Sequence, residues 1–320
     1  MSDLFLLEQS VRKGEWLEMP LSSFYAGTTG PPEGEHPYAI RNWLLSTGHF
    51  PEKWINRLYS VGGIRMHNKR IMLRLFAETD LTTHPLYTRA AASLNEPVPS
   101  VLFEDDHCLV LNKPAGMPVH PSSPEVSGTL DEAVVRHSLL SGQAVPIRHI
   151  HRLDDETSGP VLYAKNDLAQ YRLDEDMRAK RISRLYVALV QGKLSNRKGT
   201  IDLPIGRDRH HPSRRRVSRT GDRAVTHYEV LETYTTASMV SIRLETGRTH
   251  QIRVHFSHLG HALIGDRLYG GDTSLLSHQA LHGEKLSFRH PWHLRPVEID
   301  APRPEWFELT GKRLSARANS

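Results

Sequence analysis

Cysteine is almost missing from this sequence: Cys108 is the only one in 320 residues. A single thiol excludes an internal disulfide and a metal site built from several thiolates. No apolar run reaches the ~18 residues that a membrane-spanning helix needs. The first twenty residues contain acidic side chains and no long apolar stretch, which is atypical of a secretory signal. We therefore expect a cytoplasmic protein that does not bind a membrane.

The common motifs of nucleotide and zinc chemistry are missing as well. The chain has no GxxxxGKS or GxxxxGKT, no GxGxxG and no HExxH, so neither ATP-dependent nor NAD-dependent chemistry is indicated. Histidines are crowded at 250, 255, 258 and 261, with two more at 149 and 151. No cysteine or acidic residue lies at zinc-ligand spacing among them, so a metal-dependent hydrolase is a disfavoured alternative. We expect no metal.

Lysine is scarce too: 10 of the 41 basic residues are lysine and 31 are arginine. A planar guanidinium forms paired hydrogen bonds with phosphate, so this excess favours phosphate contacts. The stretch Arg207–Arg223 holds seven arginines and two aspartates, a local charge of +5 that equals the net charge of the chain. Such a block is either a solvated surface loop or a contact for a polyanion. We expect a loop that lines the groove for such a polyanion.

Residues 36 to 76 have the pattern of two short helices followed by a strand. A helical face runs through Tyr38–Leu45, and Pro51 stands at the first turn of a second helix. Lys53 and Arg57 lie one turn apart on that helix, and Arg65 follows on the strand. The arrangement resembles a degenerate RNA-binding domain of the ribosomal-protein-S-four type. An ordinary helical hairpin with exposed charges is the alternative.

From Val101 onward the pattern mixes helices and strands. A hairpin is predicted at 101–111, and capping-box signals at Thr129 with Glu132 and at Asp167 with Gln170 predict the starts of two helices. Further strand-like segments are 187–190, 225–231 and 239–244. Strands outnumber helices and no βαβ rhythm occurs, which indicates an α+β fold with a largely antiparallel mixed sheet flanked by helices and loops.

Five segments carry the residues with chemical potential. HIHRLDDETSG at 149–159 is too polar for a core strand and too rich in turn formers for a helix, so we expect a loop there. The other four are NKPAG at 112–116, LYVALV at 185–190, GRTHQIRVH at 247–255 and LGHALIGD at 259–266. In this order they resemble the RluA-type family of pseudouridine synthases over about Val101 to His290. Pro160 stands where that family usually has leucine.

This resemblance implies a pseudouridine synthase fold that isomerises selected uridines in structured RNA, ribosomal or transfer RNA, without a cofactor. It makes Asp154 the catalytic carboxylate, Tyr186 the aromatic that packs against the target uracil and Arg253 the partner of Asp154. Arg152 would enter the RNA stack in place of the displaced base. The other expected RNA contacts are Lys53, Arg57, Arg65, Arg207, Arg209, Arg214, Arg215, Arg216 and Arg248.

The length of 320 residues suits about two domains of ~150 residues each. We expect an N-terminal arm at 1–35, the RNA-binding domain at 36–80, a linker at 81–100, the pseudouridine synthase catalytic domain at 101–310 and a tail at 311–320. A monomer is the default expectation.

A non-catalytic RNA-binding or ribosome-associated protein is the second alternative. It accounts for the basic segment and for the N-terminal residues. It does not account for the combination of Asp154, Tyr186 and Arg253, because a protein that only binds has no need of all three.

Overall fold

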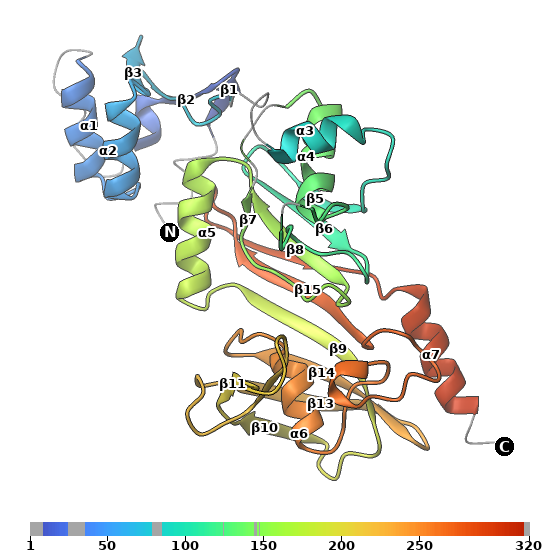
Figure 1. Ribbon diagram of the computed structural model, residues 1–320. Helices are drawn as coiled ribbons and strands as arrows, with labels where there is room; N and C mark the ends of the chain where they lie inside the picture. Colours follow the sequence, from blue (N-terminus) through green and yellow to red (C-terminus); the bar gives the residue numbers. More distant parts are fainter. Residues whose placement is uncertain are drawn as a thin grey trace.

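The computed structural model describes residues 9–24, 36–78, 85–123, 125–143, 146 and 148–316. It consists of a small N-terminal unit and a larger domain built on two antiparallel sheets (Figure 1). The prediction of an α+β fold with largely antiparallel sheets is confirmed. Within these residues no helix is both long and apolar enough to span a membrane.

The N-terminal unit is a four-stranded sheet with two helices. The strand order is β1 (Val11–Lys13), β2 (Trp16–Pro20), β4 (Arg70–Leu73), β3 (Ile64–His67), and a short 3-10 helix covers Leu21–Phe24. Helices α1 (Pro37–Ser46) and α2 (Glu52–Ser60) lie where the sequence predicts them. The predicted arm is wrong over residues 11–24, because β2 pairs with β4 and is thereby part of the unit. The rest of that arm lies outside the described residues.

The N-terminal unit is joined to the larger domain by a shared core. Trp292 is 1% exposed and belongs to the same apolar cluster as the helices of the unit, with its ring 6.1 Å from that of Phe50. The guanidinium of Arg172 donates to the carbonyls of Pro291, at 2.6 Å, and His49, at 2.5 Å. These contacts hold the two parts in one arrangement.

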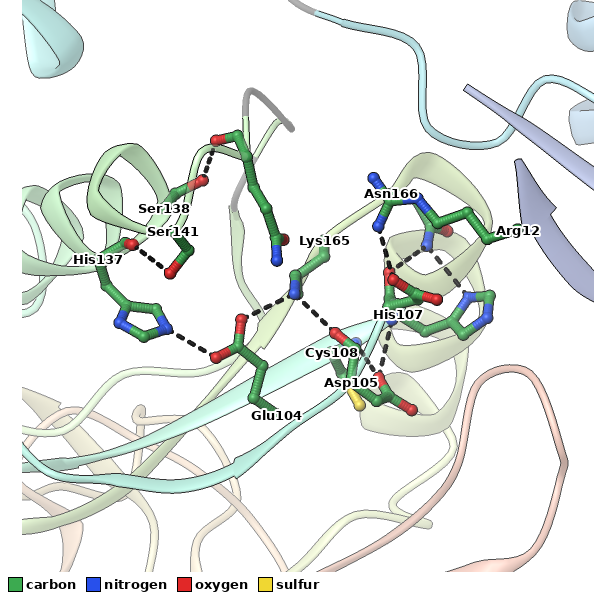
Figure 2. Close-up of polar contacts among 12 residues, drawn as sticks. Arg12, Glu104, Asp105, His107, Cys108, His137, Ser138, Ser141, Lys165 and Asn166 are labelled. Carbon is green, nitrogen blue, oxygen red and sulfur yellow. Dashed lines mark hydrogen bonds and ion pairs between the residues drawn. The ribbon is translucent and has the colours of Figure 1, made fainter. Parts of the chain in front are cut away.

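Figure 2 shows the polar side of this joint, where the β5–β6 turn meets the first strand of the unit. Arg12 of β1 forms an ion pair with Asp106 of the turn, in which Nη1 of the arginine lies 2.6 Å from Oδ1 of the aspartate. Asn166 donates to His107 at 3.2 Å, and Lys165 donates to Glu104 at 2.8 Å. The turn therefore contacts the N-terminal unit and the start of the helix after β8 at once.

Two other predicted boundaries are wrong. The stretch expected as a linker contains α3 (Pro85–Ala92), whose Tyr87 and Ala90 pack against Val135 of α4 (Leu130–Leu140). The expected tail continues α7 (Glu305–Ala316), in which Leu314 is 2% exposed. Both segments bury apolar side chains, so they belong to the folded domain.

The larger domain contains a four-stranded and a six-stranded sheet. The first has the order β5 (Val101–Glu104), β6 (Cys108–Lys113), β8 (Gly159–Ala164), β7 (Arg148–His149). The second has the order β10 (Lys198–Asp202), β13 (Val225–Thr233), β14 (Ala237–Leu244), β9 (Ser183–Gln191), β15 (Leu281–Arg289), β16 (Pro296–Asp300). The predicted hairpin and strands are present.

Helix caps follow the sequence with one correction. Thr129 and Glu132 form a reciprocal capping box at α4, as predicted. At α5 (Asp167–Arg178) the cap is Asn166 instead of Asp167, because the Asn166 side chain accepts the backbone N–H of Ala169. In both caps the side chain accepts the backbone N–H of the residue three positions later in the chain. The predicted cap of α5 is therefore one residue too late.

The two sheets meet where β8 begins. Ser158 forms a parallel bridge with His282 of β15, and the Ser158 hydroxyl lies 2.9 Å from the His282 Nδ1 atom. Gly159 has φ +129°, and a Cβ there would lie 2.6 Å from the carbonyl oxygen of Gly283. Only glycine allows this close approach of the two backbones. The loop just before β8 is therefore fixed at the seam between the sheets.

Because His107 is buried, we expect the stability of the fold to decrease in acid. Its ring stacks on Trp292 with 5.2 Å between centroids, and burial lowers its pKa from 6.5 to about 3. Between these values the unfolded chain binds a proton that the folded chain does not, so stability falls as the pH drops from 6.5 toward 3. The group can remove up to about 1.4 kcal/mol of unfolding free energy per pH unit.

We expect His107→Gln to make urea-unfolding free energies less dependent on pH between 7 and 5. The exposed His258, at the end of α6, is the matched control, and His258→Gln should keep the wild-type slope. An unchanged slope in His107→Gln would contradict this assignment.

Candidate active site

The predicted loop is confirmed over residues 150–158, whereas His149 belongs to β7 and Gly159 to β8. The backbone of this loop is firmly held. The Asp155 carbonyl accepts the Gly116 N–H at 3.0 Å and the Lys113 Nζ at 2.7 Å. Thr157 donates its N–H to the Asp154 carbonyl at 2.9 Å, which closes a tight turn at the aspartate. The Asp154 side chain is 28% exposed. The loop thus presents one carboxylate from a fixed backbone.

Lys113 is the main support of this loop. Its side chain is fully buried, and its ammonium also donates to the carbonyls of Pro114 and Met117. Burial lowers the pKa of Lys113 to about 8. The NKPAG segment was recognised in the sequence without a role, and the structure places its lysine beneath the loop that carries Asp154.

Arg253 links Asp154 to a second, buried aspartate. It lies on α6 (Gln251–His258), and its Nη1 atom donates to the Oδ2 atom of Asp154 at 3.1 Å. Its Nε and Nη2 atoms donate to both oxygens of Asp266, at 2.7 and 2.9 Å. Asp266 is 1% exposed. Burial alone would lower the pKa of Arg253, but the two carboxylates outweigh it and raise that pKa above its ordinary value.

Sequence reasoning missed Asp266, although it ends the recognised LGHALIGD segment. The available signal was an acidic residue in a motif that, apart from His261, is otherwise made of small and apolar residues. The 3-10 helix at Arg267–Tyr269 follows it, and Asp266 accepts the backbone N–H of Tyr269 at 3.3 Å. Asp266 thus anchors both the arginine and the start of this turn.

A cavity of about 990 Å³ opens above these groups. Asp154, Tyr186 and Arg253 all line it, so the structure brings the three predicted catalytic residues together. Tyr186 lies on the central strand β9, between Ile242 and Gly283 of the neighbouring strands, and is 4% exposed. A buried aromatic ring beside a partly exposed carboxylate suits a pocket for one planar base.

Arg152 lies at the rim of the cavity. Its side chain is exposed, and its Nη1 atom lies 3.2 Å from the Nε2 atom of His120. Both residues line the cavity. Arg152 is therefore an exposed cation in the cavity lining.

The basic segment is a loop over residues 208–214 and 218–223, as predicted, but two short strands interrupt it. Strands β11 (Ile205–Arg207) and β12 (Arg215–Val217) pair, with Arg207 opposite Arg215. Its tip residues His211 and Ser213 line the cavity. We call residues 205–217 the basic hairpin. A second cavity of about 270 Å³ lies against it, and its lining includes Arg207, Arg215 and Arg248.

The remaining predicted RNA contacts of this region differ in their surroundings. Arg209 and Arg216 are exposed, and Arg214 lies 3.9 Å from Asp208. Arg248 lies 3.7 Å from Asp222 and donates to the Arg223 carbonyl. All these side chains lie around the mouth of the two cavities or on the basic hairpin.

The three basic residues of the N-terminal unit lie elsewhere. None of them is among the described residues that line the two cavities. Lys53 is exposed, whereas Arg57 pairs with Asp167 of α5 at 3.1 Å. The Arg65 guanidinium lies 4.5 Å from the ring centre of Trp16. Arg57 therefore contributes to the joint between the two parts of the chain.

The crowded histidines have separate structural partners. His255 contacts the Thr226 hydroxyl and the Leu203 carbonyl, and His261 contacts the Gln191 carbonyl. Among the described residues the one group spaced to hold a metal is Asp105, Cys108 and His290. There His290 accepts two backbone N–H groups at Nδ1 and contacts Asp105 through Nε2 at 2.5 Å, so both of its nitrogens are used.

Comparison with known proteins supports the resemblance. A family model described as RNA pseudouridylate synthase matches residues 107–258. The chain is 48% identical to the Bacillus subtilis RNA pseudouridine synthase YhcT over 206 residues, which are 64% of this chain and 68% of the relative. It is 40% identical to ribosomal large subunit pseudouridine synthase D of Xylella fastidiosa, over 64% of this chain and 66% of that one.

The fold is similar to that of the human RNA pseudouridylate synthase domain containing 1. The TM-score is 0.56 and the sequence identity 26%, and the match covers 65% of this chain and 86% of the human one.

Asp266 should matter for stability as well as for the site. Removing one member of a buried ion pair costs about 3–5 kcal/mol, and Arg253 keeps its contact with Asp154, so we expect Asp266→Asn to lie near the lower end. Asp155→Asn is the control, because Asp155 supports the loop through its backbone carbonyl and its side chain is exposed. We expect the control to stay within about 0.5 kcal/mol in urea unfolding. Equal stability of the two variants would contradict the anchoring role.

Proposed function

Because the chain belongs to the family of RNA pseudouridine synthases and forms pseudouridine in RNA, we propose that Asp154 is its catalytic carboxylate. The observation that carries this proposal is the geometry of its two oxygens. The Asp154 side chain contacts Arg253 at 3.1 Å and His250 at 3.9 Å, in both cases through Oδ2. Among the described residues, therefore, Oδ1 has no protein partner and is available to the substrate.

The reaction requires a group of this kind. The bond between C1′ of the ribose and N1 of uracil breaks, C1′ bonds to C5, and the proton on C5 leaves while N1 gains one. An ionised carboxylate can assist by adding covalently to the nucleotide or by acting as a base and stabilising positive charge at C1′. Arg253 donates to one oxygen of Asp154 and so orients the carboxylate.

Tyr186 is proposed to receive the uracil. A uridine stacked in RNA is out of reach of Asp154 and must be flipped out, at a cost of a few kcal/mol. Stacking on an aromatic face recovers about 1–3 kcal/mol. Arg152, exposed at the rim, is placed to fill the gap that the flipped base leaves in the RNA.

The basic hairpin and Arg248 are proposed to hold the RNA backbone beside the cavity. Their guanidinium groups surround the second cavity, next to the one that contains Asp154. Lys53 and Arg65 are proposed to contact a separate part of the RNA from the N-terminal unit, which would act as an RNA-binding domain of the ribosomal-protein-S-four type. Arg57 is the weakest member of the set because Asp167 already neutralises it.

Ribosomal RNA is the first substrate to test, with transfer RNA as the alternative. The Xylella fastidiosa relative carries the large ribosomal subunit in its name. We also propose that the protein works as a monomer in the cytoplasm.

Asp154→Asn should abolish catalysis while RNA binding is kept, because the amide keeps the shape of the carboxylate but loses its charge. The measurement is tritium release from RNA labelled at C5 of uridine, on separate ribosomal and transfer RNA pools. We expect a loss of at least about 10³-fold in single-turnover rate, in the range seen when a catalytic group is removed.

Asp155→Asn, next in the loop and exposed, should retain the wild-type rate. Turnover by Asp154→Asn would remove the proposed role. If the wild-type protein binds RNA tightly but releases no tritium from either pool, the non-catalytic binding protein becomes the better account.

Charge reversal on the basic hairpin should weaken RNA binding without affecting the chemical step. Each phosphate contact contributes about 0.7–0.9 to the slope of log affinity against log salt, so Arg209→Glu with Arg216→Glu should flatten that slope by one to two units. Arg313→Glu, on exposed α7, is the matched control. An unchanged slope would mean that the hairpin is not part of the RNA interface.

A further inference from the structure

His250 lies against the reaction site in an uncommon backbone conformation. It precedes α6 with φ 57° and ψ 22°, in the left-handed region, and its side chain makes no capping hydrogen bond to the helix. This conformation costs about 1–2 kcal/mol for a residue with a Cβ, and such strain concentrates at functional sites. A side chain that does not cap its helix is free for another task.

That task is indicated by the two atoms its ring faces. Nδ1 lies 2.9 Å from the hydroxyl of Tyr269, and Nε2 lies 3.9 Å from the Oδ2 atom of Asp154. The two rings meet edge to face, with 5.7 Å between their centres. His250 therefore stands between a tyrosine hydroxyl and the carboxylate that the proposed function makes catalytic.

The surroundings of the Tyr269 hydroxyl favour one tautomer of His250. The hydroxyl accepts the backbone N–H of Arg215 at 2.9 Å, so its own proton is available for the Nδ1 atom of His250. An imidazole that accepts at Nδ1 carries its proton at Nε2. The Nε2–H then faces Asp154, on the same oxygen that Arg253 holds.

Burial is the main reason why His250 favours its neutral form. Burial lowers its pKa, the charge of Asp154 opposes that effect, Arg253 and Arg215 add to it, and Asp266 opposes it. A neutral imidazole can donate to the carboxylate without adding another positive charge to the site. The 3.9 Å separation is longer than a hydrogen bond, and such contacts commonly shorten when substrate binds.

We propose that His250, fixed in its Nε2–H tautomer by Tyr269, is a positioning residue that orients Asp154 for reaction. The Oδ2 atom is then held from two sides, by Arg253 and by His250, and Oδ1 is turned to the substrate. The inference rests on the proposed role of Asp154. The inference also gives Tyr269 a role, which is to fix the tautomer of His250. The Tyr269 hydroxyl in turn accepts the backbone N–H of Arg215 in the basic hairpin.

The test compares single-turnover tritium release and RNA affinity in four variants. Tyr269→Phe and His250→Ala should each lower the rate by about 10- to 100-fold, the cost of a slightly misplaced reacting group, with RNA affinity unchanged. His250→Gln should recover most of the rate, because an amide N–H can reach the position of Nε2–H. His258→Ala, at the exposed end of the same helix, should match the wild type.

Two further readouts separate positioning from a structural effect. Tyr269→Phe should cause no additional loss in the His250→Ala or His250→Gln background, because neither side chain has a tautomer to be set. In wild type the rate should fall on the acid side as His250 becomes protonated, and His250→Gln should lack that part of the pH profile.

A wild-type rate in Tyr269→Phe, or losses that multiply in the double variant, would overturn the inference. Asp154→Asn is measured in parallel. If it stays active, the proposed function fails. If it is inactive while Tyr269→Phe is unaffected, the positioning role alone fails.

Discussion

The paired hydrogen bonds from Arg253 to Asp266 are the interaction on which the site depends. Both partners are almost completely buried, so the guanidinium is fixed in place and direction before any substrate arrives. Its Nη1 atom then donates to one oxygen of Asp154. The buried ion pair thus orients a partly exposed carboxylate and leaves its other oxygen open. Lys113 fixes the backbone of the same loop, because its ammonium donates hydrogen bonds to three carbonyls beneath it.

The fold places these groups at the seam between its two sheets. The loop with Asp154 precedes β8, Tyr186 comes from the centre of β9, and Arg253 and Asp266 come from segments that follow β14. Figure 1 shows how β8, β15 and β9 run side by side through the middle of the domain. The N-terminal unit is attached to one end of this platform through Trp292 and Arg172. A surface that binds RNA there would stand at a fixed distance from the cavity.

Much of this was predictable from the sequence, because ordered motifs carry the family, its fold and its activity. Helix caps and alternating strands were read correctly where the signal is local, as in the Thr129 capping box. The failures have a common physical cause, which is that long-range pairing has no local signal. Strand β2 looks like part of an arm until β4 pairs with it, and α3 looks like a linker until α4 covers Tyr87.

The same limit applies to the site. Asp154, Tyr186 and Arg253 could be named in advance from their motifs, whereas Asp266 and Tyr269 acquire a role only from what they touch. The basic segment was recognised by its charge. Its hairpin, in contrast, depends on backbone pairing between β11 and β12, which places Arg207 opposite Arg215. Arg57 looked available for RNA because its partner, Asp167, is far away in sequence.

The most direct test of the account is a crystal structure of the Asp154→Asn protein bound to an RNA fragment. The fragment should contain, still as uridine, a site at which the wild type forms pseudouridine. We expect the target uridine to be flipped out of the helix, with its uracil against Tyr186 and its ribose beside the residue at position 154. A uridine that remains stacked in the RNA, or a base bound away from Tyr186 and position 154, would contradict the assignment of this cavity as the reaction site.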